Sequence, residues 1–442
     1  MKTIFYSIVA TVLVMMVACE KDYDLTDIIM ANTNSTMVLT TSKFGDVTIC
    51  IAGLVGLCSI DWGDGSDREL HAIKQAYDNY FVYSESQYAY THKYFNSSTH
   101  TITITGKNLT HLYCENQGLT SLDVSNNPLL LSLSCGGNNL LNLDVSNNIE
   151  LINLSCWGNR LSSLDVGNNT RLTSLDCKNT ELTSLDVSKN IALTRLICGD
   201  NQLTSLDVSN NTALIDFFCG GNLLTILDVS KNIALQYFDC SNNQVASLDI
   251  SNSLELVNFY CHNNKLSSLD LSNNNALEYL SCSDNELSNN LDLSKKSKLI
   301  RLICFKNQLP SLDVSANIGL RELSCGYNHL SSLDVSANIA LRDLSCGYNH
   351  LSSLDVSANT KLTSLYCNNN ELTSLDVSNL NVLLVLDCSS NQLSEEALND
   401  LFESLHRNLA IVRNKEIYIS DNPGTATCDN SIALYKGWKF SN

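Results

Sequence analysis

The sequence predicts a mainly β fold: a solenoid of about 14 coils of 21 residues, with a small β-sandwich before it and a helix-strand cap after it. Three observations predict this architecture. Cysteines recur at a constant interval through the middle of the chain, apolar residues alternate twice within each interval, and the flanking residues do not repeat. The expected boundaries are 37–105 for the sandwich, 106–393 for the solenoid and 394–442 for the cap.

The N-terminus has the pattern of a secretion signal. An apolar run from Ile4 to Val17 is too short for a comfortable membrane span but suits a signal-peptide core. Val17-Ala18-Cys19 resembles a bacterial lipobox, which implies removal of residues 1–18 and a lipid on Cys19, with residues 19–36 as a polar tether. Glu20-Lys21-Asp22 resembles the acidic tethers of surface-exposed Bacteroidetes lipoproteins, which implies an exposed protein anchored in the outer membrane. An ordinary secretory signal with an incidental cysteine is the alternative.

Residues 37–105 alternate as short strands, including Val47 to Ile51, Cys58 to Trp62 and Thr101 to Thr105. The segments Ile60-Asp61-Trp62-Gly63-Asp64-Gly65 and His92-Lys93-Tyr94 resemble the W-G-D-G and H-x-Y motifs of PKD-like sandwich domains. The resemblance implies an Ig-like sandwich with a tight Asp-Gly turn, acting as a spacer or cap. Cys50 and Cys58 could pair outside the cytoplasm, and the sequence does not decide whether they do.

Fourteen of the 18 cysteines mark the repeat. They stand at positions 114, 135, 156, 177, 198, 219, 240, 261 and 282, and then at 304, 325, 346, 367 and 388, so one step alone is 22 residues. The extra residue lies within 288–291. The unit Leu193–Ala213 contains the phrase L-x-x-L-x-(C/V)-x-x-N twice, and this phrase resembles the leucine-rich repeat family, internalins included, over about residues 106–393.

In the unit Leu193–Ala213, alternation places two sets of side chains inward on opposite sides of a coil. These sets are Leu193, Leu196 and Cys198 on the Cys side and Leu203, Leu206 and Val208 on the Val side. Asn201 and Asn211 end the two segments, and we expect both to form asparagine ladders that bond backbone groups of the turn and the next coil. No C-x-x-C occurs, and in-register rotamers do not suit disulfides, so we expect packed free thiols rather than zinc ligands or bridges.

The two sides of the coil differ in uniformity. On the Val side, the residue between the inward pair is Asp in thirteen coils, from Asp123 to Asp376. We expect hydrogen bonds from Ser hydroxyls or backbone N–H groups of adjacent coils to offset repulsion along this row, with bound calcium as the alternative. On the Cys side the corresponding residue varies: Tyr113, Ser134, Asp176, Ile197, Phe218, Tyr260, Ile303 and Tyr366.

Large aromatic residues and arginines on a solvent-facing sheet are typical of binding hot spots, whereas neutral drift on a tolerant surface is the alternative. The predicted ligand-binding residues are Trp157, Arg195, Phe218, Tyr237, Tyr260, Tyr279, Arg301, Phe305, Tyr327, Tyr348 and Tyr366. His329 and His350 also lie in register, but their units are nearly identical, so duplication explains them without a metal. We predict no metal site and no cofactor.

After Leu393 the period is lost. Ser394-Glu395-Glu396 begins a predicted amphipathic helix with Leu398, Leu401, Phe402 and Leu405 on one side, and Glu416 to Ser420 is a predicted strand. Asn422-Pro423-Gly424 and Lys436-Gly437-Trp438 resemble the terminal cap of bacterial secreted leucine-rich repeat proteins.

The net charge and the absence of known catalytic motifs exclude several classes of function. Acidic residues outnumber basic ones 46 to 27, giving a net charge of -19, so we expect no nucleic-acid partner and membrane contact only through the lipid. The sequence contains no G-x-S-x-G, H-E-x-x-H, Walker A or G-x-G-x-x-G motif, and we expect a monomer that is not an enzyme. The leading hypothesis is a surface lipoprotein that binds an extracellular or host protein, in adhesion or recognition. Carbohydrate binding and a structural role in the envelope without a dedicated ligand are the alternatives.

Overall fold

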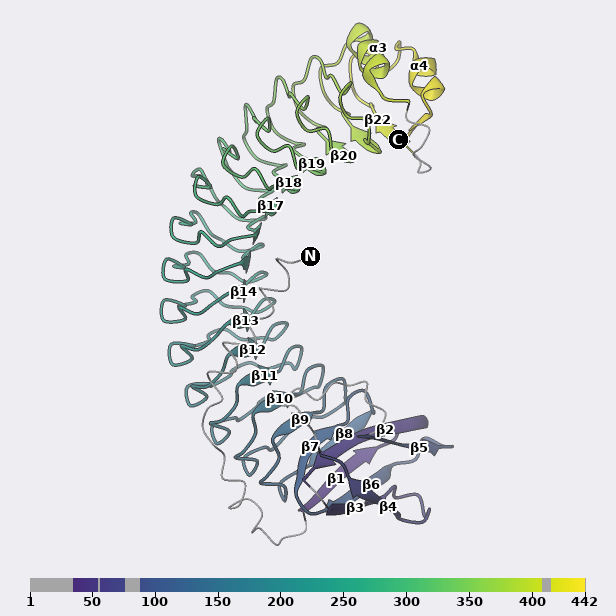
Figure 1. The fold of residues 1–442 in the computed structure, drawn as a ribbon, viewed down its shortest axis with the longest axis vertical. Coiled ribbons are helices and arrows are strands. Elements are labelled where there is room, and N and C mark those ends of the chain that lie inside the picture. Colours follow the sequence, from purple (N-terminus) through teal and green to yellow (C-terminus); the bar gives the residue numbers. More distant parts are fainter. Residues whose placement is uncertain (1–34, 55, 76–87, 408–414, 442) are drawn as a thin grey trace.

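A computed structural model describes residues 35–54, 56–75, 88–407 and 415–441. The predicted signal peptide, the lipidated Cys19 and nearly all of the tether lie outside these residues. The described chain forms an arc with the sandwich at one end and two helices at the other (Figure 1). Among the described residues, no helix has the length and apolar character needed to span a bilayer.

Two sheets build the N-terminal sandwich. The first has the order β4-β3-β6-β1-β8, and the second begins β5-β2-β7-β9. Their bounds are β1 Ser35–Thr41, β2 Gly45–Gly53, β3 Gly56–Asp61, β4 Glu69–Ile73, β5 Ala89–Tyr94, β6 His100–Gly106, β7 Leu109–Tyr113 and β8 Leu119–Asp123. Alternate residues of β2, β3 and β6 are buried, which confirms the predicted period of two and the three predicted strands.

The W-G-D-G segment makes the expected tight turn. Gly63 and Gly65 have φ values of 74° and 87°, a region that favours glycine, and a Cβ on Gly63 would lie 2.3 Å from the Thr101 carbonyl oxygen. The Tyr94 hydroxyl donates to the Trp62 carbonyl at 2.6 Å, and His92 Nε2 lies 2.7 Å from Asp64 Oδ2. The two motifs therefore join the turn to strand β5.

The solenoid contributes one short strand per coil to a long parallel sheet. The strands are β9 Ser132–Ser134, β10 Asn153–Ser155, β11 Ser174–Asp176, β12 Arg195–Ile197, β13 Asp216–Phe218, β14 Tyr237–Asp239, β15 Asn258–Tyr260, β16 Tyr279–Ser281, β17 Arg301–Ile303, β18 Glu322–Ser324, β19 Asp343–Ser345, β20 Ser364–Tyr366 and β21 Val385–Asp387. Equivalent residues of neighbouring coils are register partners, as in Leu196 with Phe217. The predicted mainly β leucine-rich repeat solenoid is confirmed.

The sandwich and the solenoid share both sheets. Strands β7 and β8 belong to the first coil, yet β7 pairs with β2 and with β9, and β8 pairs with β1. This arrangement covers the N-terminal end of the solenoid, whose strand edge would otherwise be unpaired.

The core is continuous from the sandwich to the cap. In the unit Leu193–Ala213, all six residues predicted to point inward are buried. The fourteen repeat cysteines are buried free thiols, as predicted, and burial raises the pKa of Cys198 to about 12. Cys50 and Cys58 are also free, on β2 and β3 of different sheets. Phe217, Phe238 and Phe259 replace leucine in three successive coils and stack with centroids 5.5 Å apart.

Both predicted asparagine ladders are present. On the Cys side, Asn222 Nδ2 donates to the carbonyls of Cys198 and Cys219 at 3.1 and 2.9 Å, while its Oδ1 accepts from the Leu203 N–H at 3.0 Å. On the Val side, Asn232 Nδ2 donates to the carbonyls of Val208 and Asn211 at 3.0 and 2.9 Å. Each amide thus ties its own coil to the preceding one.

The Asp row is held differently from the prediction. Asp207 Oδ1 accepts from the Ser209 N–H at 2.9 Å, two residues along the same coil, and Asp228 does the same with Ser230. The prediction of donors from adjacent coils was therefore wrong, because an Asx turn supplies the nearest free N–H. Hydrogen bonds from the Ser209 side chain and backbone N–H lower the pKa of the Asp207 carboxyl.

The C-terminal cap contains α3 Glu395–Ser404, β22 Lys415–Tyr418, α4 Asn430–Tyr435 and β23 Trp438–Phe440. Ser394 caps α3 by accepting from the Ala397 N–H, and Leu398, Leu401 and Phe402 are buried, as predicted. Strand β22 continues the parallel sheet beside β21, and β23 ends it. The predicted helix and strand are confirmed.

Candidate binding surface

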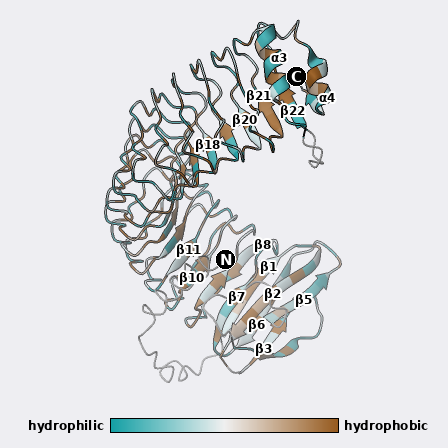
Figure 2. Ribbon diagram, turned by 45° about the horizontal axis from the view of Figure 1, so that its top comes forward, coloured by the Kyte–Doolittle hydropathy of each residue, from teal (hydrophilic) through white to brown (hydrophobic). Residues whose placement is uncertain are grey.

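The Cys-side strands line the concave side of the arc (Figure 1), and the tilted view shows the same strands on the inner side of the curve (Figure 2). After β9, whose three residues are all buried, the three-residue strands bury their middle residue and turn their first and third residues toward the concave side, as Arg195 and Ile197 do around Leu196. We call these outward residues of β9 to β22 the concave face. Since the strands are parallel and in register, equivalent side chains form rows along the arc.

The predicted residues fall into two groups. Seven lie on strands of the concave face: Arg195, Phe218, Tyr237, Tyr260, Tyr279, Arg301 and Tyr366. The other four follow the repeat cysteine and lie in turns beside the sheet: Trp157, Phe305, Tyr327 and Tyr348. Placing these four on the sheet was wrong, because each strand ends at the residue before the cysteine.

Six of the strand residues are contributed by successive coils, and we call them the central patch: Arg195, Phe218, Tyr237, Tyr260, Tyr279 and Arg301. They come from β12 to β17, where Tyr279 is the register partner of Arg301. Burial raises the pKa of the Tyr260 hydroxyl, and the Arg301 charge opposes this shift. The patch is therefore a contiguous surface of aromatic rings and guanidinium groups.

Both arginines of the central patch are fixed by acids of the next coil. Arg195 Nη1 lies 2.5 Å from Asp216 Oδ2, and its guanidinium carbon is 5.6 Å from the Phe218 ring centroid. Arg301 Nη2 lies 2.5 Å from Glu322 Oε2. These pairs are partly exposed, so their effect on stability is small, but they hold the planar groups in defined positions.

Tyr327 and Tyr348 form a separate pair. Their rings stack with centroids 3.9 Å apart and an angle of 10° between planes. Both have positive φ, 53° and 56°, at a position where the other coils have Gly, Asn or Asp, apart from Lys306 and Ser390. This conformation is unusual for a bulky residue. His329 and His350 stack nearby with centroids 6.2 Å apart, and His350 Nδ1 lies 3.3 Å from Glu371 Oε1.

The N-terminal coils do not extend the exposed surface. Tyr113 and Ser134 are buried, so the expectation that both belong to the variable solvent-facing row was wrong. Trp157 lies over Gly136, where a Cβ would be 2.3 Å from its indole nitrogen, and that nitrogen is 3.3 Å from Glu115 Oε1. Trp157 is thus packed against its own coils rather than grouped with the central patch.

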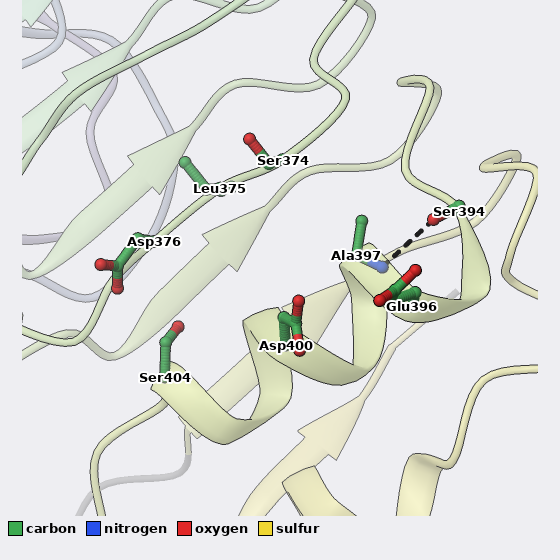
Figure 3. Close-up of a pocket in the computed structure, with 8 residues that line it drawn as sticks. All are labelled: Ser374, Leu375, Asp376, Ser394, Glu396, Ala397, Asp400 and Ser404. Atoms are coloured by element: carbon green, nitrogen blue, oxygen red, sulfur yellow. Dashed lines mark hydrogen bonds between the residues drawn. The ribbon is translucent and has the colours of Figure 1, made fainter.

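One hollow lies away from the concave face, between the last coil and α3. It has a volume of about 540 Å³ and is lined by Ser374, Leu375, Asp376, Ser394, Glu396, Ala397, Asp400 and Ser404 (Figure 3). Within the described ranges, no three His, Cys, Asp or Glu side chains are arranged to hold a metal. The hollow receives none of the aromatic residues or arginines of the predicted site.

Sequence reasoning missed three residues of the concave face. Asp239 lies between Phe218 and Tyr260 in one row, and Asp387 lies between Tyr366 and Tyr418. The 21-residue spacing of Phe218, Asp239 and Tyr260 could have revealed the first set. No spacing reveals Tyr418, because α3 separates it from the last coil.

Comparison with solved structures places the chain among leucine-rich repeat proteins. It is similar to the functional domain of InlJ from Listeria monocytogenes, a structure described as including a cysteine ladder, with 33% identity and a TM-score of 0.65, over 74% of this chain and 76% of that one. A leucine-rich repeat protein of Leptospira interrogans, LIC12759, is 21% identical, with a TM-score of 0.62 over 75% of this chain and 95% of that one. The internalin InlF of Listeria monocytogenes is 20% identical, with a TM-score of 0.53 over 66% and 84% of the two chains. No protein-family profile and no curated protein sequence matches.

Proposed function

The chain belongs to the internalin-like leucine-rich repeat proteins, and on that premise we propose that it is a non-enzymatic, lipid-anchored surface protein that binds an extracellular protein through the central patch. A binding role is supported by a solved structure of similar fold, a plant peptide hormone receptor, RGFR1, in complex with RGF2. Adhesion or recognition of a host protein is the role that we propose for this binding. The anchor is the lipid on Cys19 inferred from the lipobox, with the tether placing the arc outside the outer membrane.

The central patch is the observation that carries the proposal. Tyr and Arg, with Trp, are enriched at the hot spots of protein interfaces, and here Tyr and Arg lie on adjacent strands of one sheet. A rigid surface loses little conformational entropy on binding. The arginines are already oriented by Asp216 and Glu322, so a partner meets groups held in place.

The arrangement favours a protein over a polysaccharide. Evenly spaced aromatic rings along the arc would suit a repeating sugar chain, whereas clustered rings with arginine suit a protein surface. The aromatic residues at the first strand position are Tyr237 and Tyr279, separated by Asn258, and the following coil has Arg301 instead. The patch is thus local and mixed rather than a regular row.

The test applies the full chain to a panel of extracellular proteins and to a glycan panel. We expect a protein ligand, and we expect the variant Tyr237→Ser/Tyr260→Ser/Tyr279→Ser to lose at least about 2 kcal/mol of binding free energy, some 30-fold in Kd. Ile226→Ser is the matched control, since Ile226 is 79% exposed but lies beside the Asp row on the other side of the coil. A protein ligand whose affinity is equal for wild type and the triple variant would remove the central patch from the proposal, and binding to glycans alone would replace it with carbohydrate recognition.

A further inference from the structure

Three coils carry an aspartate at the third strand position of the concave face: Asp176, Asp239 and Asp387. Their neighbours in the row differ. Asp239 has Phe218 and Tyr260 as register partners, whereas Asp176 has Ser155 and Ile197. Asp387 repeats the first arrangement, because its partners are Tyr366 and Tyr418. An aspartate between two aromatic residues therefore occurs twice on the same face.

Asp239 and Asp387, the two aspartates between aromatic residues, each use one carboxylate oxygen in a turn and leave the other for a partner. Asp239 Oδ1 accepts from the Ser241 N–H at 2.9 Å, and Asp387 Oδ1 accepts from the Ser389 N–H at 3.1 Å and the Ser389 hydroxyl at 2.6 Å. In the part of the chain that the structure describes, neither Oδ2 has a hydrogen-bond partner, and no Lys or Arg nitrogen lies within 4.0 Å of either carboxylate. The acids Asp216 and Glu322 on the same face, by contrast, are each paired with an arginine.

The chemistry of these triplets favours a cation. The face of an aromatic ring is the negative end of its quadrupole, and a cation above it is attracted. A carboxylate flanked by two rings adds a full negative charge at the same place. In the first triplet the Arg195 guanidinium already lies 5.6 Å from the Phe218 ring centroid, so Asp239 and Tyr260 are the groups left for a partner's cation. An anion is repelled by both groups, and an uncharged apolar side chain gains nothing from the carboxylate. A hard divalent cation needs six or more oxygen ligands, which one carboxylate beside two rings does not supply.

We propose that Phe218-Asp239-Tyr260 and Tyr366-Asp387-Tyr418 are two subsites that each receive a lysine or arginine side chain of the protein partner. This inference rests on the proposed function, since it states which chemistry the concave face recognises. The first subsite lies within the central patch, and the second lies where the sheet passes into the cap. The negative charge of the protein favours the same partner, because a cationic surface is attracted before contact is made.

The two subsites also set a spacing. Asp239 is on β14 and Asp387 is on β21, seven strands further along the sheet. At about 4.8 Å per strand this separation is roughly 34 Å along the sheet, and the curvature of the arc makes the direct distance shorter (Figure 1). The partner would therefore present two cationic positions up to about 34 Å apart on one surface.

Synthetic peptides test the subsites with a defined probe. The probe is a 14-residue Gly-Ser peptide with a lysine near each end, long enough to span about 34 Å when extended. Matched peptides carry norleucine or glutamate instead of lysine. With the full chain, we expect the lysine peptide to bind at least about tenfold more tightly than the norleucine peptide, and the glutamate peptide to bind most weakly. Equal affinity for the lysine and norleucine peptides would overturn the proposal.

Variants separate the subsites from the overall negative charge. Asp239→Asn and Asp387→Asn are each expected to weaken binding of the lysine peptide about three- to tenfold, and Phe218→Leu/Tyr260→Leu to weaken it about threefold with the carboxylate intact. Asp176→Asn is the control, since Asp176 has the same strand position and the same Asx turn, with Lys178, but its register partners Ser155 and Ile197 are not aromatic. We expect less than a twofold change for it. An equal loss in Asp176→Asn would show attraction to net charge only and would sink the inference.

The same variants distinguish this inference from the proposed function. If the triple tyrosine variant loses its protein ligand while Asp239→Asn and Asp387→Asn both retain wild-type affinity for that ligand, the cation subsites are wrong and the central patch stands. If Asp239→Asn and Asp387→Asn weaken binding of the protein ligand while Tyr237→Ser/Tyr279→Ser, which keeps Tyr260, binds it fully, the subsites stand and the central patch is wrong as the main interface.

Discussion

The two sides of each coil are joined to their neighbours by asparagines that are satisfied to different degrees. On the Cys side, Asn222 uses both its amide nitrogen and its oxygen, bonding two carbonyls and one N–H. On the Val side, Asn232 bonds two carbonyls, but its buried Oδ1 has no hydrogen-bond partner among the described residues. The same is true of Oδ1 in the other asparagines of that row, from Asn127 to Asn359.

The two asparagine rows also differ in how often another residue replaces asparagine. On the Cys side, from Asn138 to Asn422, one coil departs from asparagine, with Thr180 in its place. On the Val side, Ser253, Lys296 and Leu380 stand at the equivalent position. A residue whose every polar atom is used cannot be exchanged without leaving a backbone group unpaired. The more tightly determined side is also the one whose outward residues vary, so its backbone can present different side chains in a fixed geometry.

The largest expected effect is alkaline destabilisation, which arises from the Cys side alone. Burial raises the pKa of the fourteen repeat thiols, to about 12 for Cys198, Cys282 and Cys346. Above pH 9 the unfolded chain releases thiol protons that the folded chain retains, so stability falls as pH rises toward the folded pKa values. Each thiol contributes up to about 1.4 kcal/mol per pH unit in that window. The urea midpoint should fall steeply between pH 9 and pH 10.

Well below pH 9 these thiols are protonated in both states, so the midpoint should be flat up to about pH 7.5. Alkylation followed by mass spectrometry provides the control, with the repeat cysteines modified in urea and protected in the native protein at pH 8. A midpoint that is constant up to pH 10 would contradict the packing of the ladder as buried thiols.

The next largest expected effect is a difference in the free energy of unfolding between alanine variants of the two asparagine ladders. Asn222→Ala leaves the Leu203 N–H and the carbonyls of Cys198 and Cys219 without this partner, and we expect a loss of about 3 kcal/mol in the free energy of unfolding. Asn232→Ala affects two carbonyls and also removes an unpartnered buried oxygen, so we expect about 1 to 2 kcal/mol. Urea unfolding of both variants measures the difference, and equal losses would break the distinction between the two sides.

The smallest effect concerns the left-handed position after the Cys-side strand. Lys306 has a φ of 49° and an exposed ion pair with Asp284 at 3.2 Å. Replacing it with glycine relieves the steric cost of this conformation but adds entropy to the unfolded chain, so Lys306→Gly should stabilise by about 0.5 kcal/mol. Lys265→Gly, at a position without positive φ, should destabilise instead. Destabilisation of the same size in both variants would show that no strain is present at Lys306.

Much of the solenoid could be predicted because the repeat period alone shows which residues lie beside each other in adjacent coils. When coils stack in register, residue i lies beside residue i+21, so the period identifies the inward leucines, the thiol ladder and the asparagine rows. The donors to the Asp row were predicted incorrectly, because a row suggests contacts between coils whereas Asp207 bonds Ser209 in its own coil. The burial of Tyr113 and Ser134 likewise depends on the end of the solenoid, where the period carries no information.

The sequence by itself determined the repeat, the side of each coil on which variation occurs and the helix that ends the solenoid, since each depends on local alternation or on a cap such as Ser394. The tertiary structure alone decided that the variable side lines the concave face, that β7 and β8 continue both sheets of the sandwich, and that Tyr418 lies beside Asp387. These features join segments that do not repeat or that are separated by α3. No period links such segments, and only packing brings them together.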